Sequence, residues 1–183
     1  MTCTLNWLIP EDDAELQLRL RPLREHWEAR GPGMLGRVGD LLPWLDIPSQ
    51  VTVRLINPQV GGAGRVLDSG EIEFEAVLAN PLPFLPEVVR LSWLIATSVI
   101  PTQANGTQPT ADSWRTTVSL IPAVLEAAEF VDLARCDEVT VNCALENWGD
   151  FSELTMAANL LSIWHSLNLP VNQQAWLAAS CRL

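Results

Sequence analysis

The most informative stretch of this chain is Ser69–Ile100, with the sequence SGEIEFEAVLANPLPFLPEVVRLSWLIATSVI. Its first part alternates between polar and apolar residues, which predicts a strand over Glu71–Ala79. A proline-rich turn follows, and apolar residues at helical spacing then predict a largely buried helix over Val88–Ile100. Enzymes often place reactive side chains on such a rigid strand-to-helix unit, yet this one offers one plausible carboxylate, Glu87, and no histidine or cysteine.

The residues before this stretch predict further elements. Glu15–Arg21 alternates between leucine and polar residues, which is typical of a strand with one buried face. Pro22 suits the first position of a helix, which we expect to end at Gly31-Pro32-Gly33. A second short helix is predicted over Gly33–Leu42, and the β-branched run Val51–Ile56 predicts a second strand.

The second half of the chain is predicted to be helical. Ala111–Asp132 has helical spacing, and Pro122 is expected to kink or split it. Ser152–Leu167 predicts another helix, because Ser152 is suited to cap it. Asp137–Trp148 is also predicted as a helix, although its Val139–Val141 segment is equally compatible with a strand.

Together these elements predict an α+β fold in a single domain over residues 1–183. A small, mostly antiparallel sheet of about three strands would come from the N-terminal half, and a helical C-terminal half would cover it. Hydrophobic residues make up 48% of the chain, which is enough to build a core and to leave apolar surface for a partner.

Charge and composition exclude several functions. The chain carries 22 acidic and 11 basic residues, for a net charge of −11, so it would repel the phosphate backbone of nucleic acids. Every basic residue is arginine, which rules out a Schiff-base lysine and the lysine of a Walker phosphate loop. Because no motif for a cofactor is present either, we expect none to bind.

Cysteine usage and hydropathy predict a cytoplasmic location. The four cysteines are scattered without a C-x-x-C pair, and the N-terminal residues lack the features of a signal peptide. No apolar run approaches the roughly 20 residues that span a bilayer, so we expect no membrane segment.

The chain has two histidines, His26 and His165, each next to a tryptophan in a predicted amphipathic helix. If folding brought both to Glu87, the three residues would be candidates for a catalytic site. No pair of potential ligands has the spacing of a metal site, so no metal is expected. Serines and cysteines also lack the local sequence of a nucleophile. The motifs of the chain therefore favour a function other than catalysis.

Two groups of residues are candidates for binding a partner protein. Glu71, Glu73 and Glu75 would project from one face of a strand, where they could attract a basic partner or simply discourage edge-to-edge pairing. Most of the eight tryptophans should lie in the core, but Trp44 and Trp176 could be exposed anchors for a partner or a homodimer.

The order of strand, proline turn, apolar helix, loop and further helix resembles the central unit of zincin-type metallopeptidases over Glu71–Phe130. Pro86-Glu87-Val88-Val89-Arg90 stands where that family has its H-E-x-x-H motif. Only Glu87, at the general-base position, agrees, since Pro86 and Arg90 replace the two zinc-binding histidines. The resemblance implies a relative that has lost its metal and that could still bind an extended peptide along the strand Glu71–Ala79.

These observations favour a non-catalytic cytoplasmic domain that binds another protein or associates with itself. The alternative is a hydrolase, or a degenerate metallopeptidase-like protein, whose residues converge from distant parts of the chain.

Overall fold

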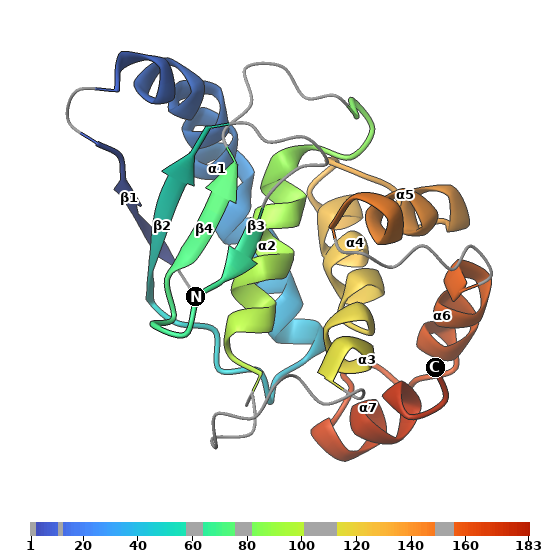
Figure 1. Ribbon diagram of the computed structural model, residues 1–183. Coiled ribbons are helices and arrows are strands. Elements are labelled where there is room, and N and C mark those ends of the chain that lie inside the picture. Colours follow the sequence, from blue (N-terminus) through green and yellow to red (C-terminus); the bar gives the residue numbers. More distant parts are fainter. Residues whose placement is uncertain (1–2, 11–12, 58–63, 76–81, 101–112, 149–155) are drawn as a thin grey trace.

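The computed structural model describes residues 3–10, 13–57, 64–75, 82–100, 113–148 and 156–183. They form an α+β fold in which the N-terminal half supplies a sheet and the C-terminal half is helical, as predicted (Figure 1). The elements, in chain order, are β1 (Thr4–Leu8), α1 (Ala14–Leu41), β2 (Gln50–Ile56), β3 (Gly64–Val66), β4 (Ile72–Glu75), α2 (Glu87–Ser98), α3 (Ser113–Val118), α4 (Ile121–Phe130), α5 (Glu138–Trp148), α6 (Met156–His165) and α7 (Gln173–Ser180).

The sheet is four-stranded and mixed, in the order β1-β2-β4-β3. β1 and β4 both pair with β2 in parallel, and only the short edge strand β3 runs antiparallel, against β4. The prediction of a mostly antiparallel sheet is therefore wrong, and the sheet has one strand more than the predicted number of about three. A parallel pair needs a long connection, and the whole of α1 provides it between β1 and β2.

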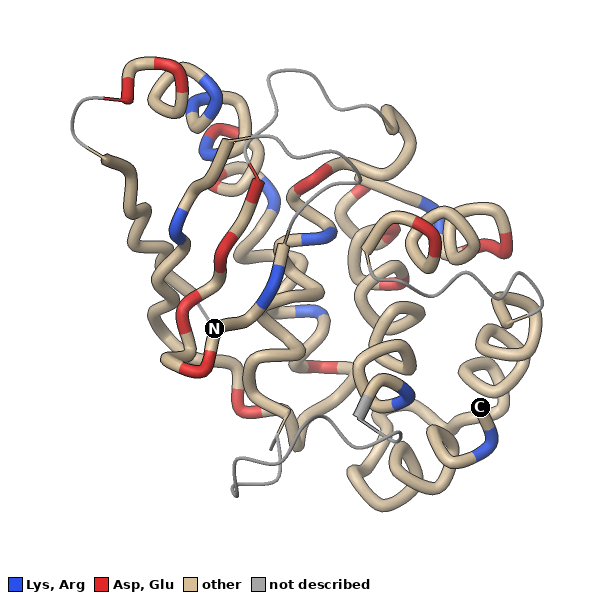
Figure 2. The backbone as a smooth tube through the Cα atoms, viewed as in Figure 1, with Lys and Arg blue, Asp and Glu red and all other residues tan. Residues whose placement is uncertain are grey.

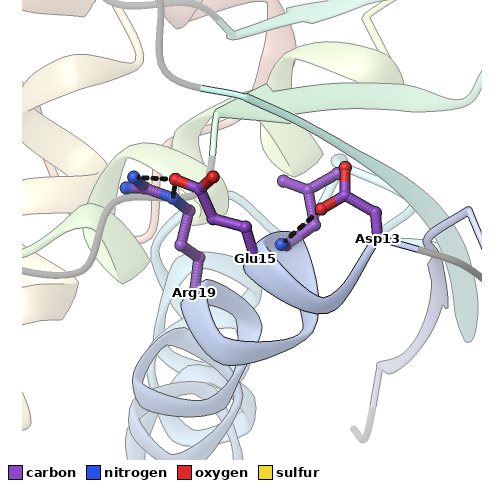
Figure 3. Close-up of polar contacts among 4 residues, drawn as sticks. Asp13, Glu15 and Arg19 are labelled. Carbon is purple, nitrogen blue, oxygen red and sulfur yellow. Dashed lines mark hydrogen bonds and ion pairs between the residues drawn. The ribbon is translucent and has the colours of Figure 1, made fainter.

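The predicted strand over Glu15–Arg21 is also wrong, because this segment is the start of α1. Its leucines fit a helix better than a strand: Leu16 and Leu20, four residues apart, are buried, whereas Leu18 is exposed. Asp13 caps the helix by accepting a hydrogen bond from the Leu16 amide at 2.9 Å, and Glu15 forms an ion pair with Arg19 one turn later (Figure 3).

The helix α1 does not end at Gly31-Pro32-Gly33 as predicted, and the separate helix over Gly33–Leu42 does not exist. Pro22 and Pro32 both lie within α1, where each removes one backbone hydrogen bond to the carbonyl group four residues earlier. Those earlier residues, Leu18 and Glu28, are exposed, so water can satisfy their carbonyl groups. The packing of α1 along its whole length then outweighs the local cost of the prolines.

One face of the sheet packs on α1 and α2 (Figure 1). Val53, Leu55, Ile72 and Phe74 project from neighbouring positions of β2 and β4 into this core, where each is at most 2% exposed. α2 is buried on nearly all sides, as its sequence predicted. Of the strand predicted over Glu71–Ala79, residues 72–75 form β4, and residues 76–79 lie outside the described part.

The remaining helices extend the core away from the sheet. The helix predicted over Ala111–Asp132 is split near Pro122, which lies in the first turn of α4. Asp137–Trp148 is confirmed as helical, including Val139–Val141. α6 begins at Met156, and Ser152, its predicted cap, lies outside the described residues.

A polar network joins α1 to two helices of the C-terminal half. Glu126 of α4 pairs with Arg37 of α1, at 3.2 Å between Oε1 and Nη2. Its other oxygen accepts a hydrogen bond of 2.9 Å from the indole Nε1 of Trp164 in α6. One carboxylate thus fixes the relative positions of α1, α4 and α6.

None of the helices in the described ranges is long and apolar enough to cross a membrane. The organisation as one domain over residues 1–183 stays a prediction.

Gly31→Ala is expected to lower the free energy of unfolding by about 1–2 kcal/mol. A Cβ atom at Gly31 would stand 2.5 Å from two ring atoms of Trp27, which is only 3% exposed and has no room to move. The resulting overpacking exceeds the gain of about 1 kcal/mol that alanine brings to a helix. Urea unfolding followed by circular dichroism measures the change.

Gly39→Ala is the matched control in the same helix. No atom lies within 4 Å of a Cβ placed at Gly39, so this variant should be more stable than the wild type by up to about 1 kcal/mol. If the two variants changed stability equally, the packing of Trp27 on Gly31 would not be what limits this position.

Candidate functional site

The carboxylate singled out by the sequence, Glu87, lies in the first turn of α2 and forms a pair with Arg90. The Arg90 Nε lies 3.3 Å from the Glu87 Oε2. The guanidinium carbon of Arg90 lies 4.8 Å from the centre of the Phe74 ring in β4, and Arg90 is only 7% exposed. The pair is therefore enclosed between the first turns of α2 and the edge of the sheet formed by β4 and β3.

Burial raises the pKa of Glu87 above its ordinary value. The positive charge of Arg90 acts in the opposite direction, and the nearby carboxylate of Glu75 adds to the rise. Carboxylates with a raised pKa are frequent in active sites, but they also occur in structural ion pairs.

The two histidines do not join Glu87. His26 and His165 are both exposed, on α1 and α6 respectively, and these helices lie on different sides of the molecule (Figure 1). Within the described residues, no group of three or more His, Cys, Asp or Glu side chains is arranged to hold a metal ion. The convergence of His26, His165 and Glu87 that a composite catalytic site requires is thus not formed.

Glu71, Glu73 and Glu75 do not form a free acidic row. β4 lies between β2 and β3, so it is not an edge strand, and the role of protecting an edge does not apply to it. Glu71 pairs with Arg54 at 2.9 Å and Glu73 pairs with Arg65 at 2.8 Å, while Glu75 is buried. An extended peptide could not add to β4 either, because β3 already occupies that side.

Trp176 is in the core, where it is 2% exposed, and its ring lies 4.7 Å from that of Trp44. The exposure that a partner-binding role requires is therefore missing for Trp176. Trp44 is partly exposed and lines a surface depression of about 620 Å³ with Asp40, Pro43 and Asp46. Its role in binding a partner stays a prediction.

The sequence reasoning missed a groove between the turn that precedes α2 and the connection from α4 to α5. The groove has a volume of about 590 Å³, and both of its sides lie at the same end of the molecule (Figure 1). Phe84 from the turn and Val139 from the first turn of α5 line it, and they are 48% and 69% exposed. Leu133 and Ala134, from the connection, add further apolar surface.

Acidic residues line the same groove as this apolar surface. Glu129, Asp132 and Asp137 line the groove, and Arg135 is the one basic residue among the described lining residues. Figure 2 shows acidic positions near the end of α4 and the start of α5. The sequence contained one signal for this site. Apolar side chains stand at two positions that are usually exposed: Phe84 follows Pro83 in a turn, and Val139 follows the acidic Glu138 at the start of a helix.

Asp137 has a second role, as the cap of α5. Its Oδ1 accepts hydrogen bonds from the amide and the hydroxyl of Thr140, at 2.9 and 2.8 Å. These bonds lower the pKa of Asp137 below its ordinary value, and the charge of Arg135 contributes to the lowering. Asp137 therefore stays negatively charged at neutral pH.

Asp137→Ala is expected to reduce the free energy of unfolding by about 1 kcal/mol at pH 7, because α5 loses its cap. A carboxyl group whose pKa is lowered by folding stabilises the protein above its unfolded-state pKa, and this contribution disappears as the pH falls through the folded-state pKa. The difference between wild type and variant should therefore shrink on acidification below the ordinary pKa of aspartate.

Urea unfolding at several pH values between 7 and 3 measures this difference. Asp137→Asn is the control, because asparagine keeps the cap but does not titrate. A difference between Asp137→Ala and wild type that did not change with pH would contradict the assignment.

Comparison with protein-family models, with curated proteins and with solved structures gave no match for this chain.

Proposed function

We propose that this chain is a non-catalytic cytoplasmic domain that binds a segment of another protein in the groove between Phe84 and Val139. The observation that carries the proposal is the pair of large, exposed apolar side chains facing one groove. Concave apolar surface with a polar surround is typical of binding sites.

Two further observations support the proposed location and the proposed kind of partner. All four cysteines are free thiols, which is typical of a reducing compartment. The net charge of −11 opposes association of the chain with itself, so a different protein is favoured over a homo-oligomer.

Selection of binders from a library of random peptides displayed on phage tests the proposal. Peptides selected on the wild-type chain should bind Phe84→Ser or Val139→Ser at least tenfold more weakly, since a few apolar anchors carry most of the affinity at such sites. Leu18→Ser, which removes an exposed leucine from α1, is the control and should leave binding unchanged. If selected peptides bound all three variants like the wild type, or if none were selected, the groove would not be a protein-binding site.

A hydrolase, or a metal-free relative of the zincin-type metallopeptidases, is the second candidate. It is favoured by one observation, the enclosed position of the Glu87 carboxylate in the first turn of the apolar helix, where burial also raises its pKa. Assays of the purified chain with chromogenic ester, phosphate and peptide substrates test it, together with elemental analysis for bound metal. Turnover that is lost in Glu87→Gln would favour the enzyme, and turnover that persists in this variant would reject Glu87 as its catalytic residue.

A further inference from the structure

We infer that the groove selects a basic segment, in which one or two apolar side chains are flanked by arginine or lysine. This inference rests on the proposed function and specifies the chemistry of the partner. Phe84, Leu133 and Val139 supply apolar contacts for the central side chains of such a segment. Glu129, Asp132 and Asp137 lie in the same groove and supply the partners for its positive charges.

The acidic residues at the end of α4 are poorly placed for the stability of their own helix. Glu129 is in the last turn of α4 and Asp132 follows its end, where the helix dipole is negative and basic residues are favoured. The last turn of α4 contains no basic residue. A positively charged ligand would offset the repulsion between these carboxylates and the negative end of the helix dipole. Binding such a ligand would explain why acidic residues stand at this end of α4.

The backbone holds this part of the groove in a defined shape. Asp132 has a φ of 57°, in the left-handed region, which is uncommon for a residue other than glycine. Its amide donates to the Glu129 carbonyl at 3.0 Å, and the Leu133 amide donates to the Ala128 carbonyl at 2.9 Å. These bonds end the helix and fix the backbone of Asp132, so this wall of the groove has a defined shape before a ligand binds.

A second copy of this chain does not provide the basic segment. Between residues 129 and 138 the sequence has four carboxylates and one arginine, and two such regions would repel each other. Most arginines elsewhere are already engaged: within the described residues, Arg19, Arg21, Arg24, Arg37, Arg54, Arg65 and Arg90 each form an ion pair with a carboxylate. A basic segment of another protein therefore matches the groove better.

Fluorescence anisotropy with three synthetic peptides tests the inference on the full chain. The probe is GRRLFRRG, and the controls are GQQLFQQG, which keeps the apolar centre without charge, and GEELFEEG, which reverses the charge. We expect GRRLFRRG to bind at least tenfold more tightly than GQQLFQQG and GEELFEEG to show no binding. Raising the salt concentration from 0.05 to 0.5 M should weaken the binding of GRRLFRRG severalfold, because exposed charges are screened.

A pair of double variants shows whether the groove charges are responsible. Glu129→Gln/Asp132→Asn removes two charges, and asparagine tolerates the left-handed backbone of Asp132. This variant should bind GRRLFRRG at least fivefold more weakly. Asp68→Asn/Glu146→Gln removes the same number of charges from exposed residues outside the lining of the groove and should bind it like the wild type.

The outcomes separate this inference from the proposed function. If GQQLFQQG bound as tightly as GRRLFRRG and Phe84→Ser abolished both, the groove would bind proteins but would not select basic ones. If the two double variants weakened binding equally, the peptide would only respond to net charge. Either result, or no binding of GRRLFRRG, would overturn the inference. The proposed function would still be tested separately, by the phage selection with Phe84→Ser.

Discussion

Phe74→Ala is expected to lower the free energy of unfolding by about 4 kcal/mol, the largest effect of any substitution considered. The Phe74 ring is fully buried on the face of the sheet that packs on α2, so its removal leaves a cavity that rigid neighbours cannot fill. It also removes the aromatic surface that lies 4.8 Å from the Arg90 guanidinium, an interaction that is stronger when it is shielded from water. Urea unfolding followed by circular dichroism measures the loss.

Phe84→Ala is the matched control, because it makes the same chemical change at a residue that is 48% exposed. Its effect on stability should stay within about 0.5 kcal/mol, as is usual for surface substitutions. The two variants also separate function from folding, since only Phe84 lines the groove. Similar losses of stability for both would contradict the placement of Phe74 in the core.

Arg90→Leu is expected to cost about 3 kcal/mol at pH 7.5, because it leaves the Glu87 carboxylate enclosed without its opposite charge. Removal of Arg90 would raise the pKa of Glu87 further, since Arg90 is the group that lowers it. A carboxyl group whose pKa is higher in the folded state takes up a proton on folding, so stability falls as the pH rises from the unfolded-state pKa through the folded-state pKa. The cost of the substitution should accordingly be smaller at pH 5 than at pH 7.5.

Unfolding experiments at these two pH values provide the measurement, and the double variant Glu87→Gln/Arg90→Leu provides the control. Glutamine carries no charge, so the double variant should recover part of the lost stability at pH 7.5 and lose the pH dependence. A cost that is the same at both pH values, or that the double variant does not reduce, would show that Glu87 is not the residue stabilised by Arg90.

The helix α1 shows where local sequence patterns were insufficient. The alternation of leucine over Glu15–Arg21 predicted a strand, and Gly31-Pro32-Gly33 predicted the end of a helix. In the structure Leu16, Leu20, Leu23 and Trp27 lie on one buried side of a single helix that continues to Leu41. The burial of that side over 28 residues outweighs the loss of two backbone hydrogen bonds at the prolines.

The arrangement of the sheet was also only partly predictable, because paired strands are distant in sequence. β2 and β4 were predicted from their own residues, whereas β1 was not predicted, since Thr4–Leu8 is short and only partly buried. The parallel direction of β1, β2 and β4 depends on the route of the connections, which no local pattern reports.

The buried helix α2, the helical second half, the break near Pro122 and the acidic charge of the molecule could all be predicted from the amino-acid sequence. Each of them depends on composition or on the spacing of neighbouring residues. Three arrangements became visible only in the folded chain: the histidines stay apart, Glu87 is enclosed beside Arg90, and Phe84 and Val139 line one groove. The physical reason is that these arrangements depend on contacts between residues far apart in the chain, whose free energies outweigh local preferences and are not encoded in any single segment.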